Sequence, residues 1–176
     1  MLFGNEMPLP ERLTEQILDR DDGSCRDINF DRLDWDGAVA ILELLLWDAS
    51  SAAATDVNGQ TLNVLAAGAA GICHHARNNK SCHVVLTDVA ELFNRLQVFV
   101  CTEEDGSAFV ELTFFPDELL QASFTTKRLI DKIIQLSTIG RANNFFLRYE
   151  NASWKLGSAG HGTGVITTWH ELQNAK

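Results

Sequence analysis

The segment with the most reactive side chains is residues 73–83, CHHARNNKSCH. Thiolates and imidazoles are the usual ligands of zinc, but structural sites pair ligands about two to four residues apart and add a second pair at a distance. Neighbouring residues of a helix point about 100° apart, so His74 and His75 would not face one ion together with Cys73. We therefore expect structural cysteines and a helix end here, with no metal and no cofactor. Whether Cys73, His75, Cys82 and His83 converge stays open.

Nucleophilic catalysis is the second chemistry that the side chains could support. The chain has four cysteines and five histidines, but it lacks the strand-turn-helix elbow of the G-x-S-x-G type. Cys101 falls in a predicted strand, which is more typical of a core cysteine. A cysteine and a histidine far apart in sequence can still meet in a fold. A small enzyme using Cys82, His83 or His161 is therefore an alternative that the sequence leaves open.

Two further segments have the composition of ligand-binding loops. The glycine-rich residues 157–164 lack the lysine and the following helix of a phosphate-binding loop, and a strand is predicted after them. The acidic residues 31–43 set Gly37 and Glu43 at two positions of a calcium loop, but Arg32 then takes the first ligand position. We predict a hairpin loop for the first segment and helix-capping aspartates for the second.

The net charge of −10 is unevenly spread along the chain. Residues 1–60 hold 13 acidic and 4 basic side chains, whereas residues 121–176 hold 3 acidic and 7 basic ones. A surface this acidic repels phosphate backbones, which argues against binding DNA or RNA. The same charge attracts a basic protein, although it could also serve only to keep the protein in solution.

The acidic block contains one large aromatic residue that could anchor a partner. Trp35 stands among carboxylates. An exposed aromatic side chain surrounded by carboxylates is a plausible anchor for a basic partner. The alternative is that Trp35 packs inward before the second helix. The residues predicted to bind a partner are Asp19, Asp21, Asp22, Asp27, Asp31, Asp34, Trp35 and Asp36.

Length and composition indicate the broad class of the protein. A chain of 176 residues with 45% hydrophobic and 22% charged residues is expected to fold as a single domain over residues 1–176. The N-terminus does not resemble a secretory signal, and no apolar run approaches the roughly 20 residues of a membrane span. Four cysteines in a chain of this length suggest free thiols in a reducing compartment. We expect a cytoplasmic protein.

Helical periodicity dominates the first half of the chain. A first helix is expected after Pro10, and residues 25–30 could form a short strand. Asp34 or Asp36 would cap a second helix that runs through the alanines at 52–54. A third helix is expected over residues 62–76.

Strand signals dominate from His83 onward. Strands are expected at 83–87, 98–102, 109–115, 144–149, 153–156 and 165–169, with a hairpin at residues 104–107. A short helix is predicted for residues 88–96, and a long helix near 125–140 is predicted to begin at Thr125 or Thr126 and to end at Gly140. The pattern predicts an α+β fold: an antiparallel sheet of about five strands, mostly from residues 83–170, with the N-terminal helices and the long helix packed on it.

A small, acidic chain of mixed structure without catalytic motifs resembles the immunity proteins with which bacteria neutralise antibacterial toxins. The resemblance concerns class and charge. It implies that carboxylates occupy the basic cleft that a toxin, often a nuclease, presents to its phosphate substrate. The leading hypothesis is therefore an acidic cytoplasmic protein that inhibits a basic partner. Besides an enzyme, the alternatives include a subunit whose basic C-terminal quarter meets the acidic block of another copy; the oligomeric state is not predicted.

Overall fold

The computed structural model describes residues 9–20, 23–150 and 164–174. Its elements, in chain order, are α1 (Leu9–Leu18), β1 (Arg26–Leu33), α2 (Trp35–Asp48), β2 (Ser51–Asp56), β3 (Thr61–Leu62), α3 (Val64–Asn79), β4 (Ser81–Val89), β5 (Phe93–Thr102), β6 (Ala108–Phe114), the short 3₁₀ helix η1 (Pro116–Glu118), α4 (Thr126–Ile139), β7 (Phe146–Tyr149), β8 (Val165–Thr168) and α5 (Trp169–Asn174).

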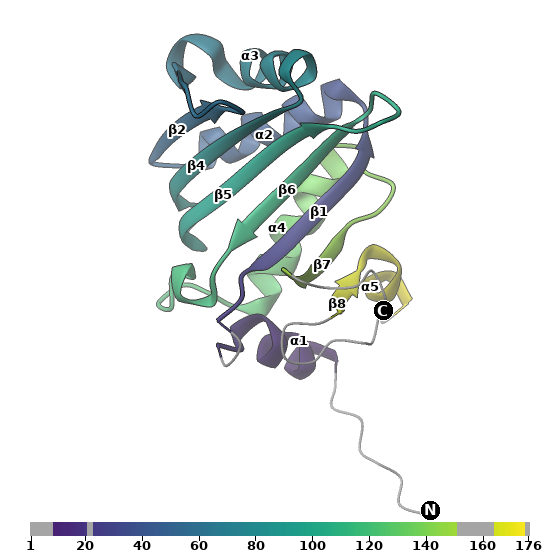
Figure 1. Ribbon diagram of the computed structural model, residues 1–176. Helices are drawn as coiled ribbons and strands as arrows, with labels where there is room; N and C mark the ends of the chain where they lie inside the picture. The colour runs from purple at the N-terminus through teal and green to yellow at the C-terminus, as the bar shows by residue number, and fades with distance from the viewer. Residues whose placement is uncertain (1–8, 21–22, 151–163, 175–176) are drawn as a thin grey trace, which may run out of the picture.

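The strands form one antiparallel sheet in the order β3-β2-β4-β5-β6-β1-β7-β8. Figure 1 shows α2 and α4 behind this sheet, while none of the helices in the described part of the chain covers the face of β4, β5, β6 and β1 that is turned to the reader. The α+β fold and the antiparallel sheet predicted from the sequence are confirmed. The sheet is larger than the expected five strands, because the N-terminal part supplies β2 and β3, which we did not expect, and β1, for which we expected only a short strand at residues 25–30.

Alternation along the strands separates the helix-covered face from the open face. In β4, Val84 and Leu86 are fully buried, whereas His83 and Val85 on the opposite side are only half-buried. Successive side chains of a strand point to opposite faces, so one face packs against the helices, while the other is partly exposed along β4 and β5 and buried at β1, where Asn29 is 0% exposed. We call the second one the open face.

The predicted start of α2 and both predicted ends of α4 are confirmed. Asp34 caps α2 by accepting a hydrogen bond from the Gly37 amide, and Thr125 caps α4 in the same way. Gly140 is the residue at which α4 ends. A Cβ added to Gly37 would lie 2.3 Å from the carbonyl oxygen of Gly140, so the start of α2 touches the end of α4 where only glycine fits.

The second helix is shorter than predicted. It ends at Asp48, and the alanines that we placed in it belong to β2, where Ala53 and Ala54 pair with Val85 and Val84 of β4. Alanine has a strong intrinsic helix propensity. Here the backbone hydrogen bonds that β2 forms with the edge of β4 outweigh that propensity.

The helix predicted for residues 88–96 is also wrong. β4 continues to Val89, β5 begins at Phe93, and the two strands pair as a hairpin. The backbone at Asp88, Ala90 and Glu91 has positive φ values of 48° to 54°, which do not occur in a right-handed helix. Residues 90–92 therefore form a tight turn between the two strands.

The third helix is confirmed, with a difference at its start. Residues Ala69, Ile72, Cys73 and Ala76 face the core, but Leu65, near the start of the helix, is 99% exposed. Gly68 has a φ of 60° and interrupts the helical backbone, so the residues before it do not continue the buried stripe.

Several sequence-based expectations fall outside what the structure tests. The strand predicted at 153–156 and the loop residues 157–163 lie outside the described residues. No helix among the described residues is long and apolar enough to cross a membrane. The single domain over residues 1–176 stays a prediction.

Candidate protein-binding surface

Carboxylates from two distant segments gather at one end of the sheet. The first group comes from the junction of β1 and α2, where Asp34 and Asp36 are exposed and Asp31 is half-buried. The second group comes from the turn between β5 and β6, where Glu104 and Asp105 are exposed. β1 and β6 are paired up to Leu33 and Ala108, so the junction and the turn lie side by side. We call this surface the acidic end; its members are Asp31, Asp34, Asp36, Glu103, Glu104 and Asp105.

Trp35 joins the two segments of the acidic end. Its indole Nε1 donates a hydrogen bond of 3.0 Å to the carbonyl oxygen of Gly106 in the β5–β6 turn. The ring is half-buried and packs on the edge of the hydrophobic core. Trp35 is therefore partly an inward staple, as one interpretation held, while part of its surface remains available among the carboxylates.

Local hydrogen bonds hold the side chain of Asp105 in place in the β5–β6 turn. Asp105 Oδ1 accepts bonds from the amide and the hydroxyl of Ser107, at 2.9 Å and 2.5 Å. These bonds to Ser107 keep the pKa of Asp105 below its ordinary value, so the side chain is a carboxylate at neutral pH. Asp105 thus presents a fixed negative charge at the acidic end.

Three arginines lie near the acidic end. Arg141 is 3.9 Å from Asp34, the Arg77 guanidinium lies 5.9 Å from the centre of the Trp35 ring, and Arg32 acts electrostatically on Asp105. Six carboxylates against three guanidinium groups leave this surface negative. Because the Asp34–Arg141 pair is more than half exposed on both sides, water and salt screen it strongly.

The residues predicted to bind a partner do not share one surface. Asp19 follows α1 at the opposite end of β1, and its carbonyl oxygen accepts a bond from buried Arg26. The eight residues of β1 span roughly 25 Å at about 3.3 Å per residue. Asp19 is therefore separated from Asp34, Trp35 and Asp36. Asp21 and Asp22 lie outside the described residues.

Asp27 requires a correction, because its side chain is inside the protein. We placed it among the exposed acids, but the residue is only 4% exposed. Its neighbours in the sheet are Thr113 on β6 and Arg148 on β7. A central position between two strands, with partners on both sides, is what removes this carboxylate from solvent.

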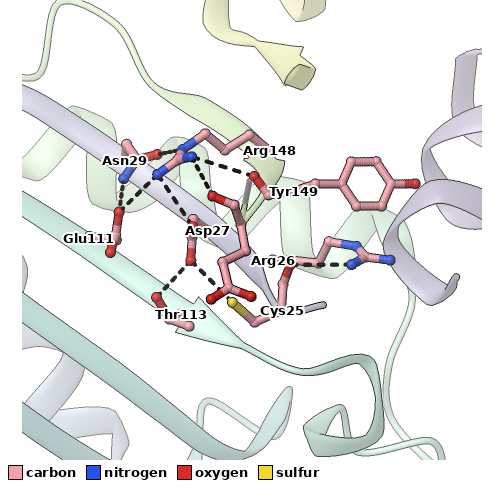
Figure 2. Close-up of polar contacts among 9 residues, drawn as sticks. Cys25, Arg26, Asp27, Asn29, Glu111, Thr113, Arg148 and Tyr149 are labelled. Atoms are coloured by element: carbon pink, nitrogen blue, oxygen red, sulfur yellow. Dashed lines mark hydrogen bonds and ion pairs between the residues drawn. The ribbon is translucent and has the colours of Figure 1, made fainter. Parts of the chain in front are cut away.

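Asp27 belongs to a polar network on the open face, which Figure 2 shows in close-up. Thr113 donates a 2.8 Å hydrogen bond to Asp27 Oδ1, and Arg148 Nη2 lies 3.3 Å from Asp27 Oδ2. The same nitrogen lies 3.3 Å from Glu111 Oε2, to which Asn29 donates a bond of 2.6 Å. Arg148 Nε in turn donates to Asn29 Oδ1 at 2.7 Å. Two carboxylates therefore share one guanidinium group.

This shortage of positive charge is reflected in the protonation of Asp27. Burial and the neighbouring Glu111 raise the pKa of Asp27 to about 6, against the opposing effects of Thr113 and Arg148. The sequence led us to expect Asp27 in the acidic surface. Its partners Glu111, Thr113 and Arg148 are far from it in the chain, so no local pattern indicated them.

The structure separates the cysteines and histidines of residues 73–83. Cys73 and Cys82 are buried in the core, whereas His83 lies on the open face and His75 is 3.9 Å from Asp56. Among the described residues no group of three or more such side chains could hold a metal ion. Burial raises the pKa of Cys73 to about 12 and that of Cys82 to about 11, so neither is a ready nucleophile at neutral pH. His161 lies outside the described residues.

The basic C-terminal region makes ion pairs within the chain. Arg148 pairs with Asp27, and Lys132 of α4 pairs with Asp48 at the end of α2. These contacts occupy cations that would otherwise be available to the acidic block of a second copy. The oligomeric state is not tested by them.

Comparisons with known proteins add one structural likeness. No protein-family model and no curated protein matches the chain. One chain of the crystal structure of the toxic C-terminal tip of CdiA from Pseudomonas aeruginosa in complex with immune protein is similar at 12% sequence identity and a TM-score of 0.48. The match covers 72% of this chain and 86% of that chain. A likeness of this degree is no basis for assigning a function.

Proposed function

We propose that this protein binds and neutralises a basic protein partner through the acidic end, and that it acts in the cytoplasm as an immunity protein against a bacterial toxin. The observation that carries the proposal is the meeting of carboxylates from the β1–α2 junction and the β5–β6 turn around the half-buried Trp35. The negative charge of the whole chain supports it.

The mechanism follows from electrostatics. Carboxylates held on a rigid strand pairing form a fixed negative patch, and such a patch accelerates the encounter with a positively charged surface. A toxin that acts on nucleic acid carries a basic cleft for the phosphate backbone. The acidic end would occupy that cleft in place of the substrate, and Trp35 would supply apolar contact area at the centre of the interface.

The proposal is tested by survival of cells that express the toxin candidate encoded next to this chain. Wild-type protein is expected to protect them, and the variant Asp34→Asn/Asp36→Asn/Glu104→Gln/Asp105→Asn is expected to protect at least tenfold less. Asparagine still caps a helix, so α2 keeps its start. The matched control, Glu15→Gln/Asp88→Asn/Asp117→Asn/Asp131→Asn, removes the same charge elsewhere and is expected to protect fully.

Two results would overturn the proposal. One is equal protection by the two quadruple variants, because net charge rather than the acidic end would then account for the effect. The other is a combination of two findings. No gene next to that of this protein encodes a toxin, and wild-type protein captures no basic protein from the source organism whose binding is lost in the acidic-end variant.

A further inference from the structure

Two aromatic rings stack on the open face of the sheet, near its middle. His83 of β4 and Phe99 of β5 are register partners, and their ring centres are 4.4 Å apart with an angle of 10° between the planes. Both side chains are half-buried. Gln97 lies within 3.2 Å of His83 Nε2 and fixes the imidazole. Burial lowers the pKa of His83, so the stack is uncharged at neutral pH.

A carboxylate stands beside this stack on the next strand. Glu111 of β6 is the register partner of Phe99, and 21% of its side chain is exposed. Its contacts to Asn29 and Arg148 use Oε2, which leaves Oε1 outside these contacts. Because Glu111 and Asp27 share Arg148, the network carries one more negative than positive charge. The site would therefore be stabilised by one additional cation.

The combination of a flat aromatic surface and a partly buried carboxylate matches one side chain in particular. A guanidinium group stacks on aromatic rings through its flat face and can at the same time donate a charge-assisted hydrogen bond from its edge to a carboxylate oxygen such as Glu111 Oε1. A lysine ammonium is a compact, strongly hydrated charge without a flat face, so it gains less from the same surroundings.

We propose that the open face binds an arginine side chain of the basic partner, with its guanidinium group against the Phe99–His83 stack and hydrogen-bonded to Glu111. The site rests on the proposed function, because it names a second contact of the same partner. β1 connects the two surfaces: it carries Asn29 of the network and reaches the acidic end at Asp31. An interface that covers both surfaces would bind an arginine side chain on the open face and positively charged side chains of either kind at the acidic end.

The test is a titration of the full chain with hexa-arginine and hexa-lysine peptides, followed by NMR residue by residue. Hexa-arginine is expected to shift the resonances of His83, Phe99 and Glu111 at concentrations at least fivefold lower than hexa-lysine. Phe99→Leu keeps an apolar side chain but removes the ring, and Glu111→Gln removes the charge; each is expected to abolish the preference for arginine. The control Phe146→Leu makes the same change on β7 and is expected to retain it.

The peptides also separate this inference from the proposed function. Equal shifts with both peptides on the open face, no shifts there, or a preference that survives Phe99→Leu would overturn the arginine site. Shifts confined to Asp34, Asp36, Glu104 and Asp105 would do so while leaving the acidic end as a binding surface. Thermal unfolding of each variant shows that it is folded, and a Phe99→Leu protein that does not fold is replaced by Phe99→Met.

Discussion

Asp27 Oδ2 lies 3.3 Å from Arg148 Nη2, in a part of the sheet where the aspartate is almost completely buried. The contact joins the first strand of the chain to a strand near its C-terminal end. It unites the acidic N-terminal region with the basic C-terminal region within one molecule. Their opposite charges, which suggested contacts between copies, are thus used in part inside the fold.

The first prediction concerns pH and Asp27. Because the folded state raises the pKa of Asp27 to about 6, it binds this proton more tightly than the unfolded chain does. The contribution of Asp27 to the free energy of unfolding is therefore full below about pH 4, falls as the pH rises to about 6, and is constant above. The expected loss is on the order of 2 to 3 kcal/mol.

Urea unfolding of Asp27→Asn between pH 4 and pH 7 checks this prediction. The variant is expected to lack that fall in stability, whereas Asp36→Asn, which removes a surface charge, is expected to keep it. A wild-type profile that rises steadily from pH 4 to pH 7 and is unchanged in Asp27→Asn would refute the assigned direction.

Arg148 is predicted to be the residue on which the buried network depends. Arg148→Met leaves Asp27 and Glu111 together without a cation, which is expected to cost about 3 to 5 kcal/mol of stability at pH 7. Adding Asp27→Asn to this variant removes one of the uncompensated charges, so the double variant is expected to be more stable than Arg148→Met alone. Additive effects of the two substitutions would show that the pair is not coupled.

A second buried arginine is predicted to hold the first helix. Arg26 is 0% exposed; it donates hydrogen bonds to the carbonyl oxygens of Gln16, Asp19 and Ser24 and lies 4.1 Å from the centre of the Tyr149 ring. Arg26→Met leaves these carbonyl groups without their donor, at an expected cost of about 2 to 3 kcal/mol.

Hydrogen exchange locates that effect. The amides of α1 are expected to exchange faster in Arg26→Met than in wild type, while the amides of β5 change less. Arg20→Met removes a half-exposed arginine paired with Asp117 and is expected to alter stability by no more than about 1 kcal/mol. Unchanged exchange in α1 of Arg26→Met would contradict the role given to Arg26.

Thiol labelling tests the burial of the cysteines. Cys25, Cys73 and Cys82 are buried, Cys101 is half-buried, and burial raises the pKa of all four. In the native protein at pH 8 only Cys101 is expected to react with a disulfide reagent, and slowly, whereas all four react in urea. Native Cys101→Ser protein is expected not to react with the reagent at pH 8. Rapid labelling of this variant would contradict the burial of the other three cysteines.

Elements that depend on nearby residues could be predicted from the sequence. Thr125 and Gly140 delimit α4, Asp34 caps α2, and the turn between β5 and β6 follows from its glycine and acidic residues. The errors arose where contacts between distant residues outweigh local preference. The alanines of β2 pair with β4, and the pairing of β4 with β5 places Asp88 and Val89 in a strand and residues 90–92 in the turn between the two strands.

The amino-acid sequence alone determined the composition of the site, namely an excess of carboxylates in the first third of the chain with Trp35 among them. Only the tertiary structure decided which of those carboxylates face solvent. The pairing of β1 with β6 brings Glu104 and Asp105 beside Asp34, and its pairing with β7 buries Asp27 against Arg148. The reason is physical: strand register joins residues far apart in the chain, and no local pattern of charge or hydrophobicity encodes which strands will be neighbours.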